Sequence, residues 1–217
     1  SHGLNYIQAV LQSYIAGRAF ENAAMAAGKT ACLCSSCVFG IALLWKKPEE
    51  QTGSRGGKMR LGIIGLGKMG FPMAERLAKG GHEVFAYNRS REKTEKAEAK
   101  GIKGAFTIKE LVESLGERKI VWLMVPAGET VDGMIRELLP LLSEGDIIVD
   151  GGNSYYKDSI ARARFLAERK ISFIDCGTSG GVWGLENGYC LMYGGDREAA
   201  SYLEPLFKTL AQENGYL

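Results

Sequence analysis

Short apolar runs alternate with segments of helical periodicity along residues 59–217. Residues 60–67 (RLGIIGLG) have the length of a buried strand, and residues 69–79 then place apolar side chains on one helical face. The alternation predicts further strands at 82–88, 119–125, 146–150, 171–176 and 188–195, and helices at 90–101, 108–115, 130–142, 155–169 and 197–210. Near-continuous apolar strands between amphipathic helices are typical of parallel sheets covered on both faces. The predicted fold class is therefore α/β, with a doubly wound, mostly parallel sheet.

Residues 1–58 differ in composition from the rest of the chain. They contain an apolar run at 37–45 and then the segment 46–58 (KKPEEQTGSRGGK), whose glycine, proline and charged residues are typical of a linker. The apolar run is too short to span a bilayer as a helix, and lysines rather than a small-residue cleavage site follow it. We expect a functional domain at 59–217, preceded by an N-terminal extension and linker at 1–58.

The composition narrows the function classes. A hydrophobic content of 46% is enough for a sizeable core, and a net charge of +2 gives no electrostatic reason to expect nucleic acid or a membrane as partner. The cluster of Cys32, Cys34 and Cys37 lacks the second pair or nearby histidine that would complete a metal site, so no metal is predicted. Nothing in the cysteine usage requires an oxidising compartment, and we expect a cytoplasmic protein.

Residues 65–70 (GLGKMG) form a G-x-G-x-x-G motif between a predicted strand and a predicted helix. Gly65 would make the tight turn, Gly67 would let the backbone approach a pyrophosphate, and Gly70 would let helix and strand pack closely. Glycine-rich turns also occur for structural reasons, but the strand–helix–strand context favours a Rossmann-type dinucleotide site. The predicted phosphate-binding residues are Gly65, Leu66, Gly67, Lys68, Met69 and Gly70.

The end of the second strand bears on which dinucleotide binds. An acidic residue that binds the ribose hydroxyls is expected there, but the sequence has Asn88, Arg89 and Ser90. An arginine with neighbouring amide and hydroxyl groups suits a 2′-phosphate. In the structural alternative, Arg89 is a solvated residue and Ser90 only caps the next helix. NADP is favoured, and NAD remains the alternative.

Three further loops follow the carboxyl ends of predicted strands. They are 125–130 (VPAGET), 151–154 (GGNS) and 177–188 (GTSGGVWGLENG). Because ligands of open α/β sheets bind outside these ends, the loops should gather around the same crevice as the glycine-rich motif. The uncharged groups of Asn153, Ser179, Gly180 and Gly181 would suit a polyol or a carboxylate. Each loop alone could also be a tight turn that needs glycine.

Four segments together closely resemble the cofactor domain of the decarboxylating 6-phosphogluconate dehydrogenases, and most closely their shorter-chain bacterial branch. They are IGLGKMG, NRSREKTEKA, DGGNSYYKDS and GTSGGVWGLENGYCLMYGGD. The resemblance extends from about Met59 to the end of the chain. It implies oxidative decarboxylation of 6-phosphogluconate to ribulose 5-phosphate in the pentose phosphate pathway, by an NADP-dependent oxidoreductase that is a homo-oligomer at full length.

The resemblance also implies roles for individual residues. Residues 65–70 and 88–90 would bind NADP, and Val125, Pro126 and Ala127 would line the nicotinamide side. Asn153 would touch both the cofactor and the sugar acid, while Ser179, Gly180 and Gly181 would bind the substrate. Family members often have a lysine in place of Pro126, so any polar contact from that position is absent. The short branch often has an aspartate near the ribose and uses NAD, which leaves the choice of cofactor open.

The catalytic base and acid of this family are a lysine and a glutamate in an all-helical C-terminal domain. The sequence ends at AQENGYL, before any such stretch, so we expect the cofactor-binding portion alone, with little or no turnover. No catalytic residue is predicted, since His82 falls at a turn and Lys68 and Lys157 have no geometric support. Two alternatives are another β-hydroxyacid dehydrogenase and a non-catalytic NADP(H)-binding module.

Overall fold

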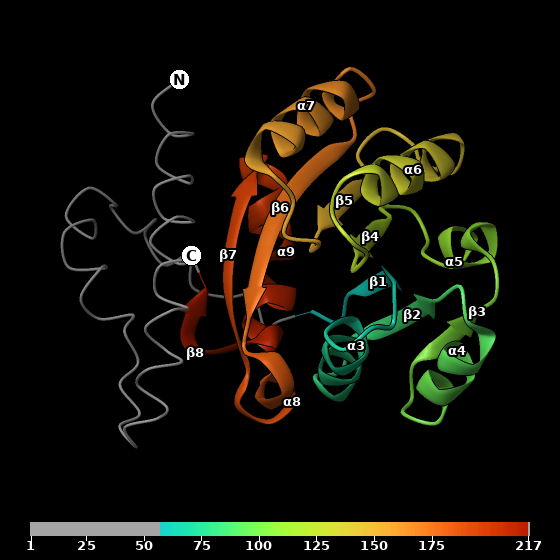
Figure 1. Cartoon of the computed structure of the whole chain (residues 1–217), viewed down its shortest axis with the longest axis vertical. Helices are drawn as coiled ribbons and strands as arrows, with labels where there is room; N and C mark the ends of the chain where they lie inside the picture. Colours follow the sequence, from blue (N-terminus) through green and yellow to red (C-terminus); the bar gives the residue numbers. More distant parts are fainter. Residues whose placement is uncertain (1–56, 217) are drawn as a thin grey trace. The chain divides into compact units, whose positions relative to one another are not determined.

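The structure, a computed structural model, describes residues 57–216 (Figure 1). The N-terminal extension predicted at 1–58, with its cysteine cluster and its apolar run, lies outside the described residues except for its last two positions.

The described residues form a mostly parallel sheet in the order β3-β2-β1-β4-β5-β6-β7-β8 (Figure 1). Strands β1 to β6 all run parallel to one another, whereas β7 runs antiparallel to β6 and parallel to β8. The chain moves outward from β1 to β3 and then returns to the other side of β1 with β4. The switch in direction therefore lies between β1 and β4, where ligands of doubly wound sheets bind. The strands are β1 Arg60–Ile64, β2 Glu83–Tyr87, β3 Lys103–Ala105, β4 Ile120–Leu123, β5 Ile147–Asp150, β6 Ser172–Ser179, β7 Tyr189–Gly195 and β8 Ala211–Tyr216.

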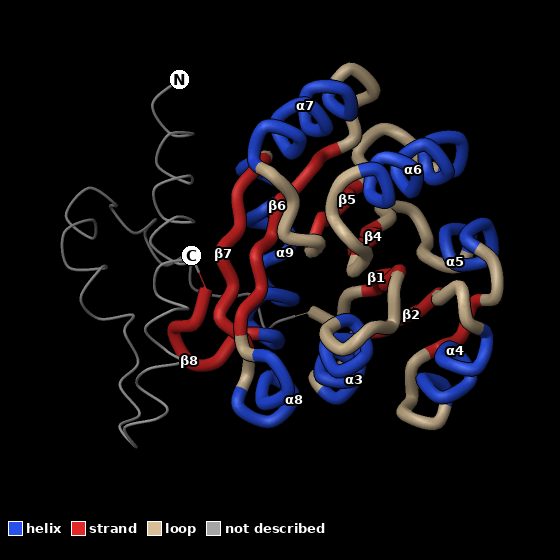
Figure 2. The backbone as a smooth tube through the Cα atoms, viewed as in Figure 1, coloured by secondary structure: helices blue, strands red, loops and turns tan. Residues whose placement is uncertain are grey.

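Helices cover both faces of the sheet (Figure 2). One core cluster joins α3, α4 and α9 to one face of the strands, and the other joins α5, α6 and α7 to the opposite face. Neighbouring residues of β4 serve the two clusters in turn, Trp122 in the first and Leu123 in the second, as expected for a strand buried on both sides. The helices are α3 Gly70–Lys79, α4 Arg91–Glu98, α5 Ile108–Glu113, α6 Glu129–Leu138, α7 Tyr156–Ala167, α8 Gly184–Asn187 and α9 Arg197–Leu210.

The predicted doubly wound fold is confirmed, with local differences. Helix α6 ends earlier than predicted and continues as the 3-10 turn η1, Leu139–Leu141, because Pro140 cannot continue the helical hydrogen bonds. Strand β6 runs three residues beyond its predicted end, since it pairs with the antiparallel β7 up to Ser179. The short elements β3, α8 and β8, and the 3-10 turn η2, Gly181–Trp183, had not been predicted.

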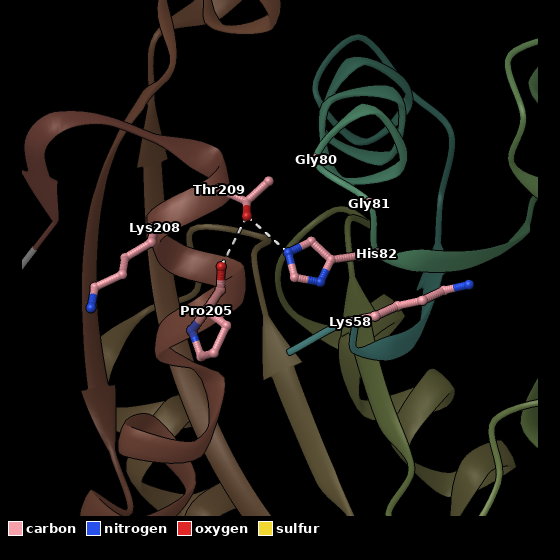
Figure 3. Close-up of a pocket in the computed structure, with 7 residues that line it drawn as sticks. All are labelled: Lys58, Gly80, Gly81, His82, Pro205, Lys208 and Thr209. Carbon is pink, nitrogen blue, oxygen red and sulfur yellow. Dashed lines mark hydrogen bonds between the residues drawn. The ribbon is translucent and has the colours of Figure 1, made fainter. Parts of the chain in front are cut away.

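At the amino edge of the sheet, a chain of hydrogen bonds links the residue before β1 to the last helix, α9, and Figure 3 shows the part of it from His82 to Pro205. The Met59 N–H donates to Nδ1 of His82 at 3.2 Å, so the imidazole proton resides on Nε2, which donates to the Thr209 hydroxyl at 2.8 Å. That hydroxyl donates in turn to the carbonyl of Pro205 at 3.0 Å. Both ring nitrogens of His82 are thus engaged in holding the fold together.

Candidate dinucleotide site at the carboxyl edge of the sheet

The glycine-rich turn lies at the switch point and is held on both sides. Gly65 has a φ of +103°, and its N–H donates to the carbonyl of Tyr87 at 2.9 Å. A Cβ at Gly65 would overlap the carbonyl of Met124, at the end of β4. The Leu66 N–H donates to Oδ1 of Asn88 at 2.9 Å. The turn is therefore fixed between the ends of β2 and β4, and Asn88 acts on the shape of the turn through this bond.

Gly67 and Gly70 differ in their surroundings. Gly67 is exposed and, among the described residues, has nothing within 4 Å of the place where a Cβ would be. Gly70 is buried, and a Cβ there would overlap the carbonyl of Gly65 and come within 2.9 Å of the Met124 Cβ. Gly67 leaves the backbone accessible to a ligand, and Gly70 lets the helix and the strand pack closely, as their places in the motif predict.

Helix α3 begins at this turn without a cap. Met69 occupies the N-cap position, no side chain of the described region accepts a hydrogen bond from the first turn, and no acidic residue lies in that turn. The first-turn N–H of Phe71 already donates to the Gly67 carbonyl at 3.2 Å, and Pro72 has no N–H, so the helix start offers an anion mainly the partial positive charge of the helix end. With the open space at Gly67, this arrangement fits the pyrophosphate of a dinucleotide.

Arg89, which follows the end of β2, has no partner in the described part of the chain. Arg89 is exposed, and its side chain forms no hydrogen bond or ion pair within residues 57–216. The nearby Arg91, by contrast, pairs with Glu95 at 2.8 Å and lies 4.4 Å over the ring of Phe106. The geometry leaves Arg89 able to meet an anion.

Ser90 stands at the N-cap position of α4, as predicted, but its side chain forms no capping hydrogen bond in the described part of the chain. The expected capping interaction is therefore absent there. The exposed hydroxyl lies beside Arg89 without a structural role at the start of this helix.

The loops after β4 and β5 contact each other. In the first, Val125 is half-buried while Pro126 and Ala127 are exposed. A Cβ at Gly152 would come within 2.7 Å of the Val125 carbonyl, and one at Gly151 would overlap the sulfur of Met124. Only glycine permits this approach of the two loops.

Asn153 lies at the tip of the loop after β5, exposed and with a φ of +56°. Asparagine tolerates this left-handed conformation better than most residues. A Cβ on Gly177 of β6 would lie 3.9 Å from the Asn153 Oδ1, so the side chain reaches toward the neighbouring strand. The loops after β1, β4 and β5 and the end of β6 thus meet at one edge, as predicted.

The loop after β6 turns over Tyr189. Ser179 is half-buried and Gly180 and Gly181 are exposed, with φ values of +137° and +51° for the two glycines. A Cβ at Gly184 would overlap the Tyr189 ring, and burial raises the pKa of this tyrosine to about 12. The ring supports the loop from beneath.

Helix α3 is tied to the same region through Arg76. This side chain donates to the carbonyl of Leu185 in α8 at 3.0 Å and to the carbonyl of Thr209 in α9 at 2.9 Å. The helix that starts at the glycine-rich turn and the helix that follows the Ser179 loop are therefore connected directly.

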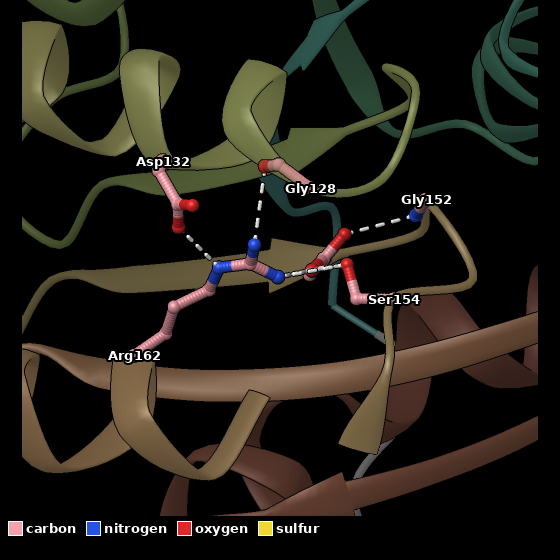
Figure 4. A network of polar contacts seen from close by, with 6 residues as sticks. Gly128, Asp132, Gly152, Ser154 and Arg162 are labelled. Carbon is pink, nitrogen blue, oxygen red and sulfur yellow. Dashed lines mark hydrogen bonds and ion pairs between the residues drawn. The ribbon is translucent and has the colours of Figure 1, made fainter. Parts of the chain in front are cut away.

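Arg162 of α7 had not been predicted from the sequence, although it organises this edge (Figure 4). Its side chain is only 5% exposed and lies among two carboxylates, a hydroxyl and a carbonyl. Its partners are Asp132 Oδ1 at 2.7 Å, Ser154 Oγ at 2.8 Å, the Gly128 carbonyl at 3.1 Å and Asp150 Oδ2 at 3.3 Å. The signal in the sequence was Asp150 itself, because a carboxylate at the end of a fully buried strand requires a partner.

The charges around Arg162 shift neighbouring pKa values. Hydrogen bonding to Arg162 lowers the pKa of Asp132. Asp175, the register neighbour of Asp150 on β6, has its pKa raised to about 6, first by burial and further by the Asp150 charge, against the opposing Ser159 hydroxyl and Arg162. The carboxyl end of β5 is therefore a buried, charged site with limited contact with water.

The other titratable candidates lie elsewhere. His82 is at the amino edge and both its ring nitrogens are occupied, while Lys157 lies 5.9 Å over the rings of Tyr155 and Tyr156. Among the described residues, no three His, Cys, Asp or Glu side chains are placed to hold a metal ion. Within residues 57–216, no helix has the length and apolar character needed to cross a membrane.

Comparison with known proteins agrees with this geometry. Residues 60–216 match the family model of the NAD-binding domain of 6-phosphogluconate dehydrogenase. The NAD(+)-dependent decarboxylating 6-phosphogluconate dehydrogenase of Haloferax volcanii is 43% identical over 70% of this chain and 50% of its own length. The NADP(+)-dependent enzyme of Bacillus subtilis is 41% identical over 71% of this chain and 34% of its own length.

A solved structure supports the same assignment. The 6-phosphogluconate dehydrogenase of Plasmodium falciparum, studied with NADP+ and with 6-phosphogluconate, superposes with a TM-score of 0.68 at 30% identity, over 72% of this chain and 35% of its own. The chain thus spans about half or less of the length of these relatives. With the matched region extending from β1 to the end of β8, the chain belongs to the family of the NAD-binding domain of 6-phosphogluconate dehydrogenase, a family of oxidoreductases.

Proposed function

We propose that residues 57–216 are the cofactor domain of an NADP-dependent 6-phosphogluconate dehydrogenase. The observation that carries the proposal is the pairing of an uncapped helix start at an open Gly67 with an Arg89 that has no partner among the described residues. The start of α3 and the backbone of residues 65–70 would hold the pyrophosphate. Arg89 would bind the 2′-phosphate, with Ser90 beside it. Val125, Pro126, Ala127 and Asn153 would line the nicotinamide side.

The preference for NADP rests on these residues rather than on the relatives. The NAD(+)-dependent and NADP(+)-dependent relatives are 43% and 41% identical to this chain, a difference too small to decide between the cofactors. A guanidinium left free within the described region, beside a hydroxyl and with no carboxylate at the strand end, favours a phosphate over bare ribose hydroxyls.

Calorimetric titration with NADP and NAD tests the cofactor, with Arg89→Ala as the variant and Arg91→Ala as the matched control. Arg89→Ala should weaken NADP binding by about tenfold or more, the equivalent of a lost hydrogen bond between charged groups, with little effect on NAD. Arg91→Ala should leave the preference unchanged, because Arg91 is engaged with Glu95 and Phe106. An NADP preference that survives Arg89→Ala refutes the role of Arg89, and failure to bind either dinucleotide refutes the cofactor function.

The substrate half of the proposal concerns Asn153, Ser179, Gly180 and Gly181, which would contact 6-phosphogluconate. This half of the proposal is supported by the position of Asn153, whose side chain reaches the end of β6 beside the cofactor turn. Titration of 6-phosphogluconate in the presence of NADP should show binding that Asn153→Ala weakens. Stronger binding of another short hydroxyacid in competition would instead favour a related β-hydroxyacid dehydrogenase.

A further inference from the structure

We propose that Arg162 is a positioning residue that sets the nicotinamide end of the dinucleotide site. It would do so by fixing the loop 124–128 against the loop 151–154, without touching the ligand. The inference rests on the proposed function, because these two loops carry the residues assigned to the nicotinamide side.

The guanidinium joins the two loops directly (Figure 4). On one side, Nη2 donates to the carbonyl of Gly128, the last residue of the first loop, and Nε donates to Asp132 in the first turns of α6. On the other side, Nη1 donates to Ser154 in the second loop and to Asp150 at the end of β5. Because the planar guanidinium has a rigid fork, these contacts define the separation and the angle of the two loops.

Asp150 links Arg162 to the backbone around Asn153. One of its oxygens accepts from the Gly152 N–H at 2.9 Å and the other accepts from the Ser154 hydroxyl at 2.7 Å, on either side of Asn153. Asn153 has a left-handed backbone, which asparagine tolerates, and these two hydrogen bonds hold the residues on either side of it. The charge pair between Arg162 and Asp150 is therefore part of what directs the Asn153 side chain toward β6.

Stability alone does not account for this arrangement. A buried ion pair is on average no more stabilising than well-packed apolar residues of the same volume, and in some proteins such pairs instead fix one geometry. The helix–sheet interface around it already has an apolar core, with Leu166 of α7 packed beneath the sheet. Arg162 therefore lies where the loops 124–128 and 151–154 contact each other, and not at a gap in the apolar core.

Arg162→Lys and Asp132→Asn test the proposal through two ligands. NADPH spans the whole site, whereas adenosine 2′,5′-bisphosphate contacts only the adenosine half, formed by residues 65–70 and 88–90. Arg162→Lys should weaken NADPH about tenfold, the equivalent of one lost hydrogen bond at the nicotinamide end, and change the bisphosphate by less than about twofold. The fluorescence change of the bound nicotinamide should diminish in parallel. Asp132→Asn should shift both readouts in the same direction by a smaller amount.

Arg118→Lys is the matched control at the amino edge of the sheet. Arg118 donates to the carbonyl of Gly145 at 3.0 Å and lies 4.1 Å over the Tyr202 ring, so it too is an arginine that holds a loop. Its substitution should leave the affinities for both ligands unchanged. Equal weakening of NADPH and the bisphosphate by Arg162→Lys, or no weakening of either, overturns the proposal.

The two ligands also separate this inference from the proposed function. If the unsubstituted protein binds neither ligand, the cofactor function is wrong and the inference falls with it. If Arg162→Lys does not fold, Asp132→Asn carries the test, because Asp132 is 41% exposed and its substitution leaves the buried pair of Arg162 and Asp150 intact. A normal NADPH affinity in a folded Asp132→Asn protein would then count against the proposal.

Discussion

The three glycines of the cofactor turn show how one residue type serves different needs. Gly65 supplies a backbone conformation, with a φ of +103°. Gly70 provides the room that helix α3 needs to pack on the ends of β1 and β4. Gly67 provides neither a special backbone conformation nor packing room, because it faces open space in the described region. Only Gly67 of the three therefore has no packing or conformational role among the described residues, which points to a role in binding.

Substitution with alanine should separate these roles. Gly67→Ala should change the free energy of unfolding by less than about 0.5 kcal/mol, as for a surface position, because no described residue lies near the added methyl group. It should nevertheless weaken dinucleotide binding by about tenfold or more, the equivalent of one charge-assisted hydrogen bond. Gly70→Ala should destabilise the fold by about 1–3 kcal/mol through overpacking against Gly65 and Met124. Urea unfolding and calorimetric titration measure the two effects, and wild-type affinity in Gly67→Ala would show that no phosphate approaches this glycine.

At the scale of the elements, the starts of the helices differ in how they are satisfied. Helix α9 begins with a capping bond, in which Oδ1 of Asp196 accepts from the Ala199 N–H at 2.8 Å. Helix α5 has the equivalent bond from Glu110 to Thr107 at 3.0 Å. Helices α3 and α4 have no side-chain cap from residues 57–216, and both start at the carboxyl edge beside the proposed cofactor site. The starts of α6, α7 and α8 also lack a side-chain cap among the described residues, so a missing cap by itself does not mark the ligand site.

Alanine substitutions at two N-cap positions test this difference. Asp196→Ala should lower the free energy of unfolding by about 1 kcal/mol, the usual contribution of an N-cap. Ser90→Ala should change it by less than about 0.5 kcal/mol, because Ser90 makes no capping bond within the described residues, while weakening NADP more than NAD. Denaturant midpoints give the stabilities. An equal loss of stability in both variants would mean that Ser90 caps α4 after all.

At the scale of the whole molecule, the two edges of the sheet have different tasks. The amino edge is held by structural hydrogen bonds, such as those from His82 through Thr209 to Pro205 (Figure 3) and from the Met59 N–H to His82. The carboxyl edge has the exposed Arg89 and Asn153 and the starts of α3 and α4. Left-handed backbone occurs at both edges, with Gly145 and Lys170 at the amino edge, so the edges differ in their exposed polar groups rather than in backbone strain.

The buried His82 should make stability depend on pH. Burial lowers its pKa from the ordinary value of 6.5, so below that pH the unfolded chain binds a proton that the folded protein does not. The His82 contribution to stability is therefore present above about pH 6.5 and is lost as the pH falls toward its lower folded pKa. Asp175, with its pKa raised to about 6, acts in the opposite sense, since its folded form gains protons first.

His82→Gln isolates the histidine, because glutamine can keep a hydrogen bond but does not titrate. The unsubstituted protein should be the more stable of the two at pH 7.5, and its advantage should shrink or vanish at pH 5. Thermal melts of both proteins at the two pH values measure the difference, in which the contribution of Asp175 cancels. An advantage that stays constant between the two pH values would show that His82 does not titrate on unfolding.

Most of the fold and much of the candidate site could be predicted from the sequence. The long periodic elements, the glycine-rich turn and the loops at the strand ends depend on local patterns, which a sequence shows directly. The short elements β3 and α8 were missed because three or four residues carry too little pattern to be distinguished from a turn. The direction of β7 also escaped prediction, since strand pairing depends on contacts far apart in the chain.

The sequence by itself determined the class of fold, the family and the edge at which the loops gather, because each follows from residue types at fixed spacing. Only the tertiary structure decided which of the charged side chains at that edge lack a partner within the described residues. Among residues 57–216, it left Arg89 without a partner, engaged Arg91 with Glu95 and Phe106, and buried Arg162 among four polar groups. An arginine has the same chemistry at all three places, and only the neighbours brought by folding distinguish a ligand-binding charge from a structural one.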